Sequence, residues 1–288
     1  MKLAELVSGL DSYFRVPDVQ GDDWSKAFAQ VYPDPYWREY VVAGWEGHWN
    51  GLSVRGADEV ERAVTCVFPS DRIVAELEPA TLLFAEHPLD FADEPGFLPL
   101  SLETYETVRE LGISLYNVHA PLDMHPEVSP SRLCAQGVRL EGLEEYFPMC
   151  EGIPGGAAII GESRLSVDGL AEALRSYLGP EIKVHVLTRP RGEAGRVAMV
   201  AGGGAQADIL EASLERGCQT YVTGNAATTC RLDFVQEQVR AFRERADAAG
   251  VTLIDAMHYG MEKPPQLAMV EWFRSRGLDA EFVPDGPN

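Results

Sequence analysis

The chain has 288 residues, of which 45% are hydrophobic and 24% charged, and this composition excludes long disorder and allows a substantial core. Its 45 acidic and 24 basic residues give a formal net charge of -21 at pH 7. Such a surface repels a phosphate backbone, so we expect no nucleic-acid partner. No stretch approaches the ~20 apolar residues that cross a bilayer, so we expect no membrane association. Scattered cysteines without a C-x-x-C pair indicate reduced thiols and a cytoplasmic protein.

Hydrophobic periodicity predicts that helices and strands alternate along the first half of the chain. We expect a helix over 2–14, a Trp- and Pro-rich region of short helices and loops over 17–50, strands over 63–68, 81–85 and 113–118, and helices over 70–78 and 104–112. This order is typical of a mostly parallel sheet that is covered by helices.

The second half continues the same alternation. We expect strands over 182–188, 196–201, 220–224, 251–257 and 279–283, and helices over 167–179, 207–217, 233–250 and 264–277. No flexible linker separates the halves. The sequence therefore predicts an α/β fold of two intimately joined α/β domains, with mostly parallel sheets flanked by helices. We expect residues 1–140 plus 250–288 in one domain and residues 141–249 in the other.

Three of the six histidines directly follow a predicted strand, and each has a carboxylate nearby. The pairs are Glu86 and His87 after 81–85, His119 and Asp123 after 113–118, and His258 and Glu262 after 251–257. Because ligands of open α/β sheets bind beyond the carboxyl ends of strands, these side chains are expected to meet. His258 and Glu262 have the spacing that places two side chains on one helix face.

This ligand set predicts a two-metal site. Imidazole and carboxylate groups without a thiolate suit Zn²⁺, Mn²⁺, Fe²⁺ or Ni²⁺. Six ligands exceed the need of one ion, and they fit two divalent transition-metal ions about 3.5–4 Å apart. Such sites activate water for hydrolysis of a small-molecule substrate.

The remaining histidines and two glycine-containing turns have simpler interpretations. His48 and His185 are expected to be packing residues, while His125 could support a ligand or lie on the surface. The glycines at 202–204 could hold a phosphate, but they lack a dinucleotide or P-loop motif, so a tight turn is the simpler interpretation. Residues 223–225 could point polar groups at the site or form an ordinary turn.

Several short motifs, in the right order from Trp49 to Phe282, resemble the Nif-three-like family (Ngg-one-interacting factor three), whose members are often labelled GTP cyclohydrolase type 2 homologues. The matching segments are WNGL at 49–52, EHP at 86–88, NVHAPLD at 117–123, VAMVAGGGA at 197–205, YVTGN at 221–225 and MHYGME at 257–262. Two positions depart from the family's motifs. Glu86 stands in place of a histidine, and Asn225 stands in place of an acidic residue.

The resemblance implies a dinuclear metal site, a hexameric homo-oligomer and a nucleotide or other small phosphorylated substrate. A metal-dependent hydrolase is therefore the first hypothesis. The alternative is a non-enzymatic metal carrier, insertion factor or regulatory protein, since a resemblance of fold does not establish a reaction. The departures at Glu86 and Asn225 also leave open a site that has lost its metal.

Overall fold

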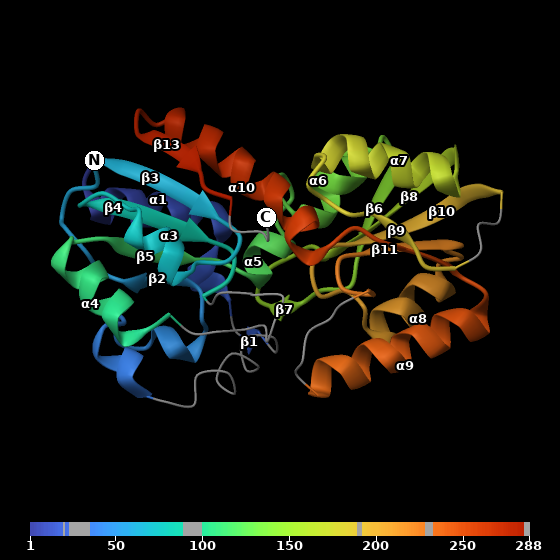
Figure 1. Ribbon diagram of the computed structural model, residues 1–288, viewed down its shortest axis with the longest axis horizontal. Coiled ribbons are helices and arrows are strands. Elements are labelled where there is room, and N and C mark those ends of the chain that lie inside the picture. Colours follow the sequence, from blue (N-terminus) through green and yellow to red (C-terminus); the bar gives the residue numbers. More distant parts are fainter. Residues whose placement is uncertain (20, 23–34, 89–99, 189–191, 228–232, 285–288) are drawn as a thin grey trace.

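The computed structural model describes residues 1–19, 21–22, 35–88, 100–188, 192–227 and 233–284. Two sheets flanked by helices lie beside each other, and helix α10 (His258–Arg274) extends from one towards the other (Figure 1). This arrangement confirms the predicted α/β fold class. Part of the Trp- and Pro-rich region, at 23–34, lies outside the described residues.

The first sheet has five strands in the order β13-β3-β4-β5-β2. The strands are β13 (Asp279–Phe282), β3 (Arg62–Cys66), β4 (Thr81–Ala85), β5 (Ser114–Asn117) and β2 (Gly51–Val54). The first four are mutually parallel, as predicted, and β2 pairs antiparallel with β5 at the edge. The carboxyl ends of β3, β4 and β5 therefore meet at one edge of the sheet.

Helices cover both faces of this sheet. Helices α3 (Asp71–Ala75) and α4 (Leu102–Glu110) cover one face, together with a cluster of tryptophans. Helix α1 (Leu3–Phe14) and helix α10 cover the other, where Phe84 and Tyr116 of the sheet are fully buried. Ser70 caps α3 by accepting a hydrogen bond from the backbone N–H of Ile73.

The second sheet has six strands in the order β6-β8-β10-β11-β12-β9. They are β6 (Glu141–Tyr146), β8 (Ala158–Ser166), β10 (Glu193–Val200), β11 (Thr220–Thr223), β12 (Thr252–Asp255) and β9 (His185–Val186). Strands β10, β11 and β12 are parallel, whereas the pairings of β6, β8 and β9 are antiparallel. This sheet is therefore mixed.

Helices α6 (Pro130–Gly137) and α7 (Val167–Leu178) cover one face of the second sheet. Helices α8 (Ala207–Glu215) and α9 (Asp233–Ala249) cover the other. Shorter elements complete the described chain: η1 (Val16–Asp18), η2 (Pro35–Glu39), η3 (Trp45–Gly47), the pair β1 (Gly21–Asp22) and β7 (Cys150–Glu151), and α5 (Ala120–Asp123).

Within the described residues, no helix is long and apolar enough to cross a membrane.

Several observed elements differ from the sequence expectation, among them strands β2, β6 and β8, which were not expected, and three differences bear on the site. Helix α10 begins at His258 and not at residue 264, so it includes both candidate ligands of the segment. Strand β9 has two residues where seven were expected, because pairing with β12 extends over residues 185–186 alone. Strand β12, expected in the first domain with residues 250–288, pairs with β11 in the second sheet, while β13 joins the first.

Candidate metal centre

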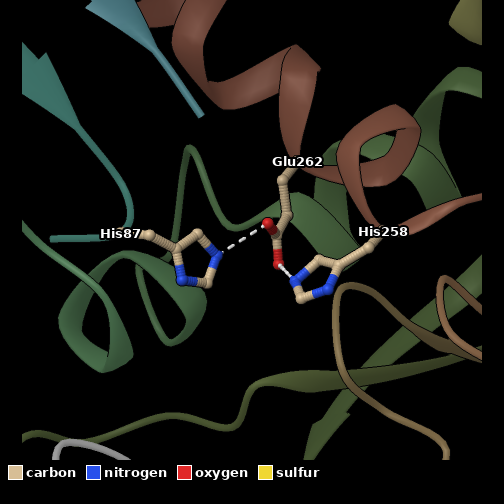
Figure 2. Close-up of side chains that lie close together, drawn as sticks. All are labelled: His87, His258 and Glu262. Carbon is tan, nitrogen blue, oxygen red and sulfur yellow. Dashed lines mark hydrogen bonds and ion pairs between the residues drawn. The ribbon is translucent and has the colours of Figure 1, made fainter. Parts of the chain in front are cut away.

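Two strand ends and one helix bring three predicted ligands together (Figure 2). His87 follows β4 of the first sheet, His258 follows β12 of the second sheet, and Glu262 lies one turn into α10. One potential ligand atom of each residue lies within 4.8 Å of the other two. Residues far apart in the sequence therefore form one cluster, and their role as metal ligands stays a prediction.

The carboxylate of Glu262 lies between the two imidazoles. Its Oε2 is 2.9 Å from His87 Nε2, and its Oε1 is 2.8 Å from His258 Nε2. The side chains of Glu262 and His87 are each 3% exposed, and that of His258 is 10% exposed. In the described part of the chain, Glu262 forms no ion pair with a lysine or arginine. Its contacts with ionisable groups in this part of the chain are therefore those with the two histidines.

The local environment favours the protonation states that bind metal ions. Burial lowers the pKa of the His87 imidazole to about 4, against the opposing effect of Glu262, so this imidazole is neutral at pH 7. Burial raises the pKa of the Glu262 carboxyl, but His258 and His87 outweigh this effect and bring the pKa to about 2. A neutral imidazole and an ionised carboxylate are the ligating forms of these groups.

The donor set fits a divalent transition metal. A buried carboxylate without a lysine or arginine partner needs positive charge nearby, because isolated charges are costly to bury. Nitrogen and oxygen ligands without a thiolate match the preferences of Zn²⁺, Mn²⁺, Fe²⁺ and Ni²⁺. Cys134, which is buried close by, donates its thiol hydrogen to the backbone oxygen of Met261, and burial raises its pKa well above the usual range. This thiol is therefore protonated and a poor ligand.

The other three predicted ligands are not part of this three-residue cluster. The ring centre of His119 is 4.9 Å from that of His87, and its backbone N–H donates to Asn50 Oδ1 at 2.8 Å. Glu86 is fully buried, with Gln266 Nε2 3.5 Å from its Oε2. Asp123 is 8% exposed at the end of α5. Whether these residues bind metal stays a prediction.

An aromatic ring that the sequence analysis did not single out orients the two imidazoles. Phe68, in the loop after β3, stacks on His87 with ring centres 4.6 Å apart and an interplanar angle of 24°. It also lies edge-on to His258 at 5.4 Å. Phe68 is 2% exposed and shields the cluster on this side. Its position after the first of three parallel strands is the sequence signal that could have identified it.

The two glycine-containing turns also lie at the cluster, although ordinary turns were the simpler expectation. A Cβ placed on Gly202 would lie 2.0 Å from Glu262 Oε1 and 3.1 Å from His258 Nε2. A Cβ on Gly224 would lie 2.7 Å from the Cα of His258. The backbones after β10 and β11 can approach the cluster this closely because neither residue has a side chain.

The remaining histidines point to other parts of the molecule. His125 stacks against Tyr13 and Phe14, with ring centres 4.3 and 5.3 Å away, and its Nε2 contacts the backbone oxygen of Tyr13. His125 is therefore a packing residue. His48 accepts a backbone hydrogen bond from Asn50. His185 lies exposed on β9.

Fold and site together define a two-sheet α/β protein with a buried His/Glu cluster of metal-ligand type. A family model for Duf34/NIF3 (NGG1p interacting factor 3) matches residues 44–283, and the chain belongs to this family. The match confirms the resemblance that the sequence motifs indicated.

Similar proteins and solved structures agree with this assignment. A GTP cyclohydrolase 1 type 2 homolog of Yersinia pestis is 28% identical over 243 residues, which cover 83% of this chain and 90% of the relative. Another protein of that name, from Deinococcus radiodurans, is 28% identical over 260 residues, which cover 90% of this chain and 83% of the relative. The crystal structure of TTHA1606 from Thermus thermophilus matches with a TM-score of 0.65 at 23% identity. The match covers 100% of this chain and 99% of the TTHA1606 chain. The structural likeness establishes the fold.

Proposed function

We propose that this chain binds two divalent transition-metal ions and hydrolyses a nucleotide or another small phosphorylated molecule. The observation that carries the proposal is the position of Glu262 between two histidines that come from different sheets. Each carboxylate oxygen faces a different imidazole, at 2.9 and 2.8 Å, so one carboxylate can serve two ions. The relatives named GTP cyclohydrolase 1 type 2 homolog support a nucleotide as the substrate class.

His87, His258 and Glu262 would hold the ions, and Glu86, His119 and Asp123 are the candidates to complete their coordination. Bound divalent ions supply Lewis-acid chemistry, which lowers the pKa of water towards ~7 and polarises a phosphoryl group or ring carbon. The chain's own contribution is to keep His87 and Glu262 deprotonated, to fix the imidazoles against Phe68 and to exclude bulk water on that side.

The test combines elemental analysis with a turnover screen of His258→Ala and a matched control, His185→Ala, which removes an exposed histidine on β9. Wild type is expected to hold about two metal equivalents per chain. It should also release product from nucleotides or generic phosphoesters when Mn²⁺, Zn²⁺ or Fe²⁺ is added. His258→Ala should lose both properties and His185→Ala should keep both.

Two outcomes would contradict the proposal. Tightly bound metal without turnover on any nucleotide or phosphoester would favour a metal carrier or regulatory protein. Wild-type protein that binds no metal after reconstitution would indicate a site that has lost its function. Homo-oligomeric assembly and a cytoplasmic location, which the resemblance and the composition imply, stay proposals. A hexameric mass in light scattering would support the first of them.

A further inference from the structure

In the loop that follows β10, three backbone carbonyls accept hydrogen bonds, whereas two glycine amides have no acceptor among the described residues. The carbonyl of Gly202 accepts from the Gly224 N–H at 3.2 Å, and that of Gly203 accepts from Gln206 Nε2 at 3.0 Å. The carbonyl of Gly204 accepts from the Tyr221 hydroxyl at 2.6 Å. In the described part of the chain, the N–H groups of Gly203 and Gly204 donate to no acceptor. These two amides are therefore available to a ligand, whereas the N–H groups of Ala201, Ala205 and Gln206 already donate within the chain.

Asn225, at the end of the neighbouring strand β11, adds a donor to the same place. Its side chain is almost completely buried, with 6% of the residue exposed. Its Oδ1 accepts a hydrogen bond from the Ala205 N–H at 2.8 Å, which fixes the orientation of the amide. A Cβ placed on Gly203 would lie 3.9 Å from Asn225 Nδ2. Across the described residues, this Nδ2 has no acceptor, so its two hydrogens remain available.

A second buried polar group faces the loop. Thr223 is fully buried, and its hydroxyl has no hydrogen-bond partner among the residues that the structure describes. A Cβ placed on Gly204 would lie 2.9 Å from this hydroxyl oxygen. A buried hydroxyl without a partner is costly, and a ligand that offers oxygen acceptors would satisfy it. The start of α8 offers fewer free N–H donors to a ligand, because Asp208 Oδ1 already accepts a hydrogen bond from the Ile209 N–H.

We propose that Asn225 and the amides of Gly203 and Gly204 bind a phosphate group of the substrate, next to the metal centre. This inference rests on the proposed function, since Gly202 connects the two sites by lying against Glu262 and His258. Amide N–H groups in a glycine-rich loop bind phosphate oxygens well, because a bare backbone can approach them closely. A carboxylate at position 225 would repel a phosphate, whereas the neutral amide attracts it. Asn225 is thus a specificity-determining residue.

The test is a calorimetric titration of inorganic phosphate into Mn²⁺-loaded wild type and Asn225→Asp, with metal content measured on the same samples. The aspartate keeps an acceptor for the Ala205 N–H but replaces the NH₂ donor with negative charge. We expect unchanged metal content and phosphate binding weakened by about tenfold or more. Asn225→Ala, which removes the donor without adding charge, should weaken phosphate binding less.

A matched control and a second anion complete the experiment. Gln219→Glu adds the same charge at an exposed position before β11, at the opposite end of this strand, and should leave phosphate binding unchanged. Acetate should bind more weakly than phosphate. Equal phosphate affinity in wild type and Asn225→Asp, loss of metal in that variant, or preference for acetate would each overturn the inference. If wild type holds no metal, the proposed function fails. The phosphate site is then tested by comparing phosphate binding of metal-free wild type and metal-free Asn225→Asp, and equal affinity would again overturn the inference.

Discussion

Gly202 determines how closely the loop after β10 approaches the candidate ligands. Its φ of +61° lies in the left-handed region, which costs other residues roughly 1–2 kcal/mol. A Cβ at this position would lie 2.0 Å from Glu262 Oε1, a distance that real Cβ contacts do not reach. Because Glu262 is held by two histidines, the carboxylate cannot move away without leaving His87 or His258. A side chain at 202 therefore competes with the cluster itself.

Gly202→Ala is expected to lower both metal content and thermal stability. The added methyl group displaces the Glu262 carboxylate, and backbone strain lowers Tm by a few degrees, about 2–4 °C for each kcal/mol. Gly203→Ala is the matched control, because a Cβ there would meet only Asn225 Nδ2, at 3.9 Å. Elemental analysis and calorimetry would measure both effects. Equal metal content in the two variants would show that Gly202 does not constrain the site.

Local spacing explains which site residues could be predicted from the sequence. His258 and Glu262 are four residues apart on a helix, and His87 directly follows a strand, so their positions depend on regular local geometry. Phe68 and Gly202 could not be assigned in this way. Phe68 reaches His87 from the neighbouring strand β3 of the same sheet, and Gly202 reaches Glu262 from the loop after β10. These contacts depend on tertiary packing and not on local spacing.

At the level of elements, the edge strand β2 fixes the end of β5 where His119 begins the next turn. Asn50, which directly precedes β2, is fully buried. Its Oδ1 accepts the backbone N–H of His119 at 2.8 Å, and its Nδ2 donates to the backbone oxygen of His48 at 2.6 Å. One side chain thus connects two loops, and His119 lies beside His87 as a result.

Asn50→Ala is expected to destabilise the fold by roughly 1–3 kcal/mol, since it leaves the buried N–H of His119 without a partner. It should also weaken metal binding by releasing His119. Ser53→Ala is the matched control, because the Ser53 hydroxyl donates to the Leu115 carbonyl on the same pair of strands. Chemical unfolding and metal titration would separate the two effects. Similar metal affinity in both variants would mean that the position of His119 does not depend on Asn50.

The start of α10 illustrates why element boundaries were harder to predict than element types. The expected start at 264 agrees with the ordinary behaviour of Pro264 and Pro265, because proline is common in a first turn and disrupts a helix interior. The observed helix tolerates both. Pro265 has no N–H for the carbonyl of Met261, and Cys134 Sγ donates to this carbonyl instead, at 3.5 Å. The compensating contact comes from another helix, α6, so the local sequence does not reveal it.

For the whole molecule, the cluster lies where the two sheets meet. His87 belongs to the end of the first sheet and His258 to the end of the second, and α10 packs against β3, β13, α6 and α7. A metal ion held by both histidines would therefore cross-link two halves of the fold. An ion that binds the folded chain at about 100 times its Kd adds about 2.7 kcal/mol to the free energy of unfolding.

Metal loading is thus expected to raise Tm by several degrees, and chelation should reverse the rise. Differential scanning calorimetry would measure it for wild type and Glu262→Gln with and without Mn²⁺. The variant matters because a chain with a formal net charge of -21 attracts cations over its whole surface, which raises Tm without a specific site. Glu262→Gln changes this surface charge very little, yet it removes the carboxylate between the two histidines. A Tm rise in wild type that the variant lacks would place the stabilising ion at the junction of the sheets. An equal rise in both proteins would assign it to the acidic surface instead.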